Sequence, residues 1–167
     1  GSTTTLAGNT AIVGTGIWTY VSGPGGYVIT NPSLPATTIT GLVTGTYVFN
    51  WTITNSVCPP TTDNVQITVY DALLNQVSAP VITICAGQSI TINGAIPIGG
   101  TGIYTYQWEQ SIDGGATWTT IAGATNINYN PGILTQTTLF RRVVSSALCT
   151  GPQANNSIPV TVTVNED

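Results

Sequence analysis

One seven-residue phrase occurs twice in the chain and sets its organisation. Residues 14–20 read Gly-Thr-Gly-Ile-Trp-Thr-Tyr, and residues 100–106 read Gly-Thr-Gly-Ile-Tyr-Thr-Tyr. The two copies lie 86 positions apart and differ at a single position. Self-similarity at a domain-sized distance indicates a duplicated unit. The 167 residues are therefore predicted to form two domains of about 70–85 residues each.

The composition predicts β-structure. Threonine occurs 31 times, and only 5% of the residues are charged. The clearest strand is Thr46–Thr54, where alternation places Tyr47, Phe49, Trp51 and Ile53 on one face. Further strands are predicted at intervals of about 8–12 residues, which is typical of a β-sandwich. They are Gly16–Ser22, Thr37–Thr40, Asn64–Tyr70, Val81–Ile84, Ser89–Ile92, Ile103–Gln110, Thr117–Ile121, Ile127–Asn130, Thr138–Ser145 and Ile158–Val164.

The charge pattern excludes several classes of function. The chain has a net charge of −4, no His and no Lys, and its basic residues are Arg141 and Arg142. Nucleic acids and anionic membrane surfaces are excluded as partners, because binding to them depends on neutralising phosphates. His-assisted nucleophiles and His-containing zinc sites are excluded as well. No apolar run approaches the roughly 18 residues that a transmembrane helix needs.

The cysteines suggest an immunoglobulin-like arrangement in the second domain. Cys85, Trp108 and Cys149 follow one another in the Cys–Trp–Cys order of that fold. We expect a disulfide between Cys85 and Cys149, with two free thiols as the alternative. The fold class expected is therefore all-β, with two tandem immunoglobulin-like sandwiches at residues 3–70 and 80–164. Residues 71–79 are expected to be a linker of coil.

Cys58 has no partner within the first domain. Cys85 moved back by the repeat distance falls just before residue 1, so we expect the sequence to begin inside the first domain. That domain would lack its N-terminal strand and leave an open sheet edge. The alternative is that the first domain never contained a bridge. We expect a monomer, although an unpaired Cys58 could link two copies.

Several segments resemble known repeats. Ser22–Gly25, Thr37–Leu42, Gly45–Asn55 and Cys58–Pro60 resemble the PKD-like repeats of large surface proteins in gliding and polymer-degrading Bacteroidota. The second domain is similar to an Ig-like repeat of the same proteins. The segments that carry this likeness are Tyr104–Trp108, Ser111–Trp118, Ile121–Thr125, Tyr129–Pro131, Arg141–Val144 and Cys149. The resemblance implies a secreted or cell-surface protein, commonly exported by type IX secretion, and repeats that serve adhesion, gliding motility or spacing.

The acidic residues suggest structure more than catalysis. Ser111, Asp113, Gly115 and Trp118 match the Asp-box hairpin of sialidase propellers, which we interpret as a carboxylate-stabilised turn. Glu109 and Asp113 could be proposed as a glycosidase pair, but nothing indicates a pocket that would raise a carboxyl pKa. We expect no enzymatic activity.

No cofactor is expected. Asp63, Asp71 and Asp113 were weighed as Ca²⁺ ligands, but no clustered Asp loop exists, and solvated turn acids are favoured.

The four tryptophans divide into two groups. Trp51 and Trp108 are predicted to be core residues. Trp18 and Trp118 are the candidates for a surface that stacks on sugar. One of Arg141 and Arg142 is expected to stack on Trp108 or pair with Glu109, and Arg142 is expected to point inward because it corresponds to Trp51.

Two functions follow from these observations. The favoured one is a non-catalytic stalk or adhesion repeat, whose partners are neighbouring repeats of the same protein. The alternative is a carbohydrate-binding module attached to a secreted polysaccharide-degrading enzyme, whose partner is an extracellular polysaccharide or surface.

Overall fold

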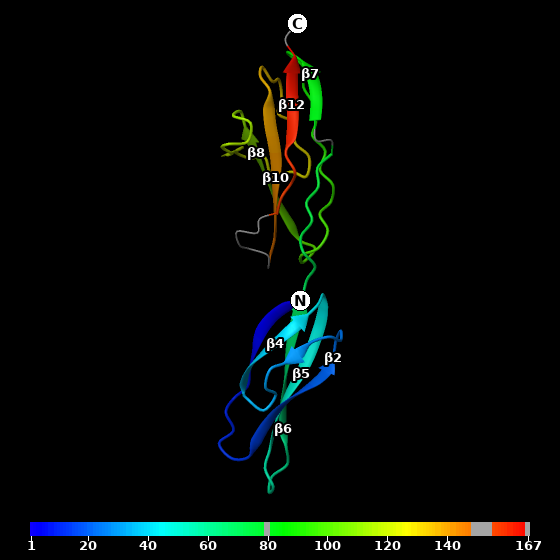
Figure 1. Ribbon diagram of the computed structural model, residues 1–167. Coiled ribbons are helices and arrows are strands. Elements are labelled where there is room, and N and C mark those ends of the chain that lie inside the picture. The colour runs from blue at the N-terminus through cyan, green and yellow to red at the C-terminus, as the bar shows by residue number, and fades with distance from the viewer. Residues whose placement is uncertain (79–80, 148–154, 166–167) are drawn as a thin grey trace. The chain divides into compact units, whose positions relative to one another are not determined.

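The chain folds into two all-β units. The computed structural model describes residues 1–78, 81–147 and 155–165, and their regular structure consists of strands. The units comprise Gly1–Tyr70 and Asp71–Asp167 (Figure 1). Within the described residues, no helix is long and apolar enough to cross a membrane.

The first unit is a sandwich of two three-stranded antiparallel sheets. One sheet has the order β1-β4-β3 and the other the order β2-β5-β6. Leu6, Ile39 and Leu42 of the first sheet pack against large aromatic residues of the second, so the core lies between the sheets. The strands are β1 (Ser2–Ala7), β2 (Thr15–Ser22), β3 (Val28–Ile29), β4 (Ala36–Leu42), β5 (Gly45–Thr54) and β6 (Thr61–Val69).

The second unit is built on one larger sheet with the order β7-β12-β10-β8-β9, and β11 also pairs with β10. β7 runs parallel to β12, and Figure 1 shows the two strands side by side. Trp108 and Phe140 are fully buried in the core against Ile92. The strands are β7 (Val81–Cys85), β8 (Tyr104–Ser111), β9 (Thr119–Thr120), β10 (Thr138–Ser146), β11 (Asn155–Asn156) and β12 (Val160–Asn165).

Three segments differ from the prediction. Ser89–Ile92 and Ile127–Asn130 were expected to be strands but contribute only isolated bridges, such as Ile92 with Tyr129. Residues 71–78, expected to be linker, belong to the second unit. Leu74 pairs there with Ile98, and the Asn75 side chain is buried. This segment therefore packs against the core of the second unit.

The strand pairing shows that the repeated phrase is not in structural register. Trp18 on β2 lies opposite Trp51 on β5, whereas on β8 it is Trp108 that lies opposite Arg142. Trp18 and Trp108 also make the same kind of contact, each in its own unit. The Trp18 indole N–H donates to Pro35 O, and the Trp108 indole N–H donates to Asn126 O. Trp18 is therefore the counterpart of Trp108, 90 positions on, and was wrongly matched to Tyr104.

The distance between equivalent positions of β2 and β8 is therefore 90 residues and differs from the repeat distance of 86. The partner cysteine of Cys58 was located with an offset of 86, which β2 and β8 do not share. Cys58 itself is a free and exposed thiol in the loop before β6. β6 is an edge strand of its sheet: among the described residues, it pairs only with β5.

Cys85 lies at the end of the sheet where β12 ends. Cys85 is a free, exposed thiol that lies opposite Asn165, beyond the start of β10. Ser146 ends β10 at the other end of the sheet. Cys149 lies outside the described residues, so the pairing stays a prediction.

We expect both Cys85 and Cys58 to react with iodoacetamide in the folded, non-reduced protein, because both thiols are exposed. Peptide mass mapping after labelling at neutral pH would measure this. Recovery of an intramolecular Cys85–Cys149 peptide would show that the disulfide forms after all.

Candidate functional site

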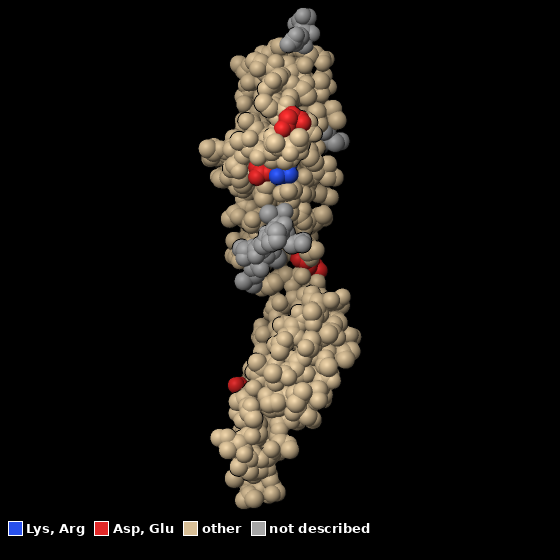
Figure 2. All heavy atoms as spheres, turned by 60° about the vertical axis from the view of Figure 1, so that its left-hand side comes forward, with Lys and Arg blue, Asp and Glu red and all other residues tan. Residues whose placement is uncertain are grey.

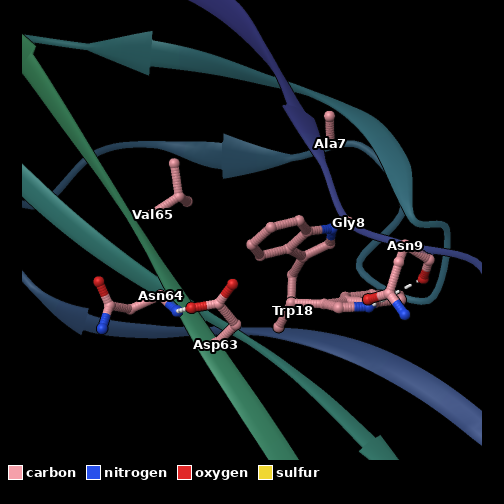
Figure 3. Close-up of a pocket in the computed structure, with 8 residues that line it drawn as sticks. Ala7, Gly8, Asn9, Trp18, Asp63, Asn64 and Val65 are labelled. Carbon is pink, nitrogen blue, oxygen red and sulfur yellow. Dashed lines mark hydrogen bonds between the residues drawn. The ribbon is translucent and has the colours of Figure 1, made fainter.

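The first unit contains a hollow of about 330 Å³ between β1 and β6. One wall is the end of β1 and the residues after it, and the opposite wall is the start of β6. Figure 3 shows Trp18 between these walls. The lining residues are Ala7, Gly8, Asn9, Trp18, Trp51, Asp63, Asn64 and Val65.

The two indoles in the hollow form a tilted pair. Their ring centroids are 5.1 Å apart and their planes meet at 40°. The Trp51 N–H donates to Asn9 O, and its ring lies directly against the backbone of Gly8. Trp18 and Trp51 are only 5% and 4% exposed. Neither indole offers a free N–H or an open face, so the hollow has an apolar floor.

The rim of the hollow carries the polar groups. Asp63 and Asn64 lie on the exposed start of β6, and the Asp63 carboxylate accepts a hydrogen bond from the backbone N–H of Asn64 at 2.8 Å. Figure 3 shows both side chains on this strand, beside the hollow. The site can therefore hold an apolar group beneath a polar, weakly acidic edge.

In the second unit, the position equivalent to Trp51 is occupied by Arg142. Phe49 and Phe140 occupy matching positions opposite Val65 and Val160, which places Arg142 where Trp51 lies. The glycine contacts agree, since a Cβ on Gly8 would meet the Trp51 ring and one on Gly94 would meet the Arg142 guanidinium. The expected correspondence between Arg142 and Trp51 is thus confirmed.

Arg142 is fully buried and surrounded by neutral oxygens. Its Nε and Nη2 both donate to Asn75 Oδ1, at 3.0 and 2.8 Å. Nη2 also donates to Gln76 O and Ala95 O, and Nη1 donates to Ile127 O at 2.9 Å.

Burial lowers the pKa of Arg142 from its usual range, and the nearby Tyr106 ring acts in the opposite direction. A guanidinium nevertheless stays protonated at physiological pH. Arg142 therefore requires the Asn75 segment as a partner.

Asn75 is the structural residue that the sequence analysis missed. Its side chain also donates to Arg142 O and to Asn155 O, each at 2.6 Å. The sequence contained a sign that such a residue was needed. Arg142 points inward from a strand that has no acidic residue, so its guanidinium must find hydrogen-bond acceptors in other segments. The segment around Asn75 was assigned to the linker, and for that reason it was not considered.

Asp113 forms the predicted turn in the β8–β9 hairpin. Its carboxylate accepts hydrogen bonds from Ser111 Oγ at 2.7 Å and from the Thr117 N–H at 2.9 Å, and Ser111 Oγ accepts one from the Gly115 N–H. The hydrogen bonds from Ser111 and Thr117 hold the pKa of Asp113 well below its usual range. This carboxyl group is thus a structural acceptor and is poorly suited to act as a general acid.

Glu109 and Arg141 form an ion pair on the surface of the same sheet. The Arg141 Nε lies 2.7 Å from Glu109 Oε2, and its guanidinium lies 4.2 Å from the centre of the Trp118 ring. The expected pairing with Glu109 is confirmed, and the stacking partner is Trp118 instead of Trp108. Trp118 is therefore partly covered, and Glu109 is not available to work with Asp113.

The other candidate residues are placed as follows. Trp18 was proposed as a sugar-stacking residue, but it is a core residue, and that proposal is wrong. Trp51 and Trp108 are core residues, as predicted. Among the described residues, no three His, Cys, Asp or Glu side chains gather where they could hold a metal ion, so Asp63, Asp71 and Asp113 do not form one Ca²⁺ site.

Comparisons with known proteins agree with this architecture. Residues 75–166, more than half of the chain, match the model of a domain of unknown function, DUF8696. The chain belongs to the DUF8696 family. Residues 2–69 match the K319L-like PKD domain. Both matches respect the boundary between the two units. No curated protein matches the chain.

Solved structures share the fold. The N-terminal four Ig domains of Dscam1 isoforms 6.9, 4.44 and 4.4 each align with a TM-score of 0.50, at 15%, 16% and 16% identity. They cover 99%, 98% and 99% of this chain, which spans 41%, 41% and 40% of theirs. At this identity the likeness establishes tandem immunoglobulin-like sandwiches and nothing more specific.

We expect Arg142→Ala to destabilise the second unit by about 3–5 kcal/mol, because it orphans a set of buried oxygens. Arg142→Lys should not restore the loss, since an ammonium lacks the planar fork. Urea unfolding followed by circular dichroism would measure both. Arg141→Ala is the matched control and should cost about 1 kcal/mol. Equal losses for Arg141→Ala and Arg142→Ala would contradict this account.

We expect Gly8→Ala to destabilise the first unit by about 1–3 kcal/mol through overpacking. The new Cβ would lie 2.9 Å from three atoms of the Trp51 ring. Gly25→Ala is the control, because nothing lies within 4 Å of its Cβ position. Urea unfolding of both variants tests the prediction, and a Gly8 variant as stable as the Gly25 variant would refute it.

The depressed pKa of Asp113 predicts a dependence of stability on pH. Because the folded-state pKa lies below the unfolded value of about 3.9, the carboxylate stabilises the hairpin above that pH. The stabilisation is lost as the pH falls below about 4. Thermal unfolding at pH 7, 5 and 3 should show a smaller acid loss in Asp113→Asn than in the parent. Asp63→Asn is the control, and an unchanged acid loss in Asp113→Asn would contradict the assignment.

Proposed function

We propose that this chain is a pair of non-catalytic spacer modules from a bacterial cell-surface or secreted protein. The observation that carries the proposal is the tandem of Ig/PKD-like sandwiches whose functional groups are engaged in internal contacts. Such folds are typical of adhesion and spacer repeats and of extracellular proteins. The resemblance of the sequence to Bacteroidota repeats supports the bacterial setting.

The arrangement of charged groups supports a structural role. Of the two carboxylates once considered for catalysis, Glu109 is paired with Arg141 and Asp113 is bound by Ser111 and Thr117. In Figure 2, one blue group lies against a red one on the second unit, and the face shown is otherwise largely uncharged. A surface of this kind has few groups that could attract or transform a charged substrate.

The core design suits a module that bears load. Each unit buries a tryptophan that pairs across its central strands, Trp18 with Trp51 in the first unit and Trp108 with Arg142 in the second. In both units the core residues come from strands far apart in the sequence, so an end-to-end pull must break many contacts together. The units are separately compact, and we expect them to yield separately.

Single-molecule force spectroscopy on the tethered chain tests the proposal. We expect two discrete unfolding steps, in which residues 1–70 and 71–167 extend to contour lengths of roughly 250 Å and 350 Å. Arg142→Ala should lower the force of the longer step alone, and Arg141→Ala serves as the control.

Two results would overturn the spacer proposal. One is extension without discrete steps at low force. The other is retention of the chain on an insoluble polysaccharide from a broad panel, since specific binding would indicate the carbohydrate-binding function instead.

A further inference from the structure

The two units differ along one sheet edge. In the second unit, β12 pairs with β10 on one side and with the parallel strand β7 on the other. In the first unit, β6 pairs with β5, and the described residues place no strand on its outer side. The backbone groups on that side of β6 are therefore unpaired within the described structure.

The register identifies the stretch of β6 that matches the paired part of β12. Phe49 lies opposite Val65 and Tyr47 opposite Ile67, while Phe140 lies opposite Val160 and Thr138 opposite Val162. Residues 66–70 are thus the counterpart of residues 161–165, which pair with Val81–Cys85 of β7.

Burial follows the same difference. Val160 and Val162 are fully buried, and on the neighbouring strand Ile84 is 8% exposed and belongs to the core. Val65 and Ile67 are the counterparts of Val160 and Val162. They are only partly buried against the core of the first unit. The first core is therefore less covered at the place where β7 covers the second.

The hollow continues this edge toward the start of β6. In the second unit, the segment before β7 lies over the equivalent position. Leu74 and Val77 bridge to Ile98 and Gly94 there, and Gln76 O accepts from Arg142. In the first unit the matching acceptor, Asn9 O, receives the Trp51 N–H, and a hollow of about 330 Å³ lies beside it. The hollow reaches Val65, and the unpaired edge continues from there along β6, so the two adjoin; together they are called the groove.

We propose that this groove is a strand-accepting site, which binds an extended peptide segment parallel to β6 in the manner of β7 on β12. The groove consists of the hollow and the outer edge of residues 66–69. Main-chain hydrogen bonds to the edge would supply affinity, and alternate side chains of the peptide would supply specificity.

The lining defines the chemistry of the peptide. Side chains two residues apart, equivalent to Ile82 and Ile84, would cover Ile67 and Val69, so they should be β-branched or otherwise apolar. The residue over the hollow should also be apolar, because Trp51 gives its N–H to Asn9 and has no donor left for an amide such as Asn75. Asp63 on the rim disfavours an acidic peptide.

A second copy of the chain is a less suitable occupant. Two β6 edges could pair with one another, but β6 has polar or charged residues at its exposed start, including Asp63 in both copies. Such pairing would also leave the hollow unfilled. We therefore assign the site to a separate β7-like segment, and self-association becomes an outcome of the test.

The test uses a synthetic peptide with the sequence of residues 73–86, carrying Asn75→Leu and Cys85→Ser, added to the ¹⁵N-labelled full chain. We expect saturable NMR shift changes at residues 63–70 and at the Trp18 and Trp51 indoles, with slower amide exchange along β6. A peptide that also carries Ile82→Asp and Ile84→Asp should bind at least tenfold more weakly.

A variant of the protein tests the same site. Val65→Asp should weaken peptide binding at least tenfold, and Val28→Asp, which is exposed on the other sheet, should leave it unchanged. If Val65→Asp fails to fold by circular dichroism, the two peptides still decide the question.

Three results would overturn the proposal. They are equal binding of the two peptides, shifts confined to the second unit, and dimerisation through β6 that the peptide does not reverse. None of these results bears on the force measurement, so the spacer proposal and the strand-accepting site can fail separately.

Discussion

The buried guanidinium of Arg142 is the interaction on which the second unit depends. Removing a cation from water costs several kcal/mol, and the structure offsets that cost with hydrogen bonds to neutral oxygens. The acceptors belong to Asn75, Gln76, Ala95 and Ile127, which lie 67, 66, 47 and 15 positions from Arg142 in the sequence. One side chain therefore fixes three loop segments against β10. It also explains why residues 71–78 are packed into the second unit instead of forming a free linker.

In the first unit, the position equivalent to Arg142 is occupied by an aromatic residue, Trp51. Trp51 replaces the guanidinium, needs only one acceptor for its N–H, and finds it in Asn9 of the adjacent segment. No additional segment is then required as a hydrogen-bond partner for the Trp51 indole. This unit closes its core with aromatic packing, and the edge of β6 and the neighbouring hollow are uncovered. The two units therefore differ both at this equivalent core position and at the neighbouring sheet edge.

Much of the fold could be predicted from local patterns. Alternation identified the inward residues of β5, and the Ser111–Trp118 motif identified the Asp113 turn, because both signals act within a few residues. The slip of the repeated phrase could not be seen. Alternation has a period of two, so a shift of four residues leaves every side chain on the same face. The contact between Asn75 and Arg142 spans 67 positions, and no local pattern encodes it. Because the repeated phrase aligns Trp18 with Tyr104 and not with the core residue Trp108, Trp18 was considered as a surface residue.

Amide hydrogen exchange on the full chain tests most directly whether the two units differ at this edge. We predict that residues 161 and 162 both exchange slowly, because β12 is paired there with β10 on one side and with β7 on the other. In residues 66–69, every second amide should exchange much faster, because only the side facing β5 is paired. Uniform protection along β6, equal to that of β12, would contradict the account of an open edge in the first unit.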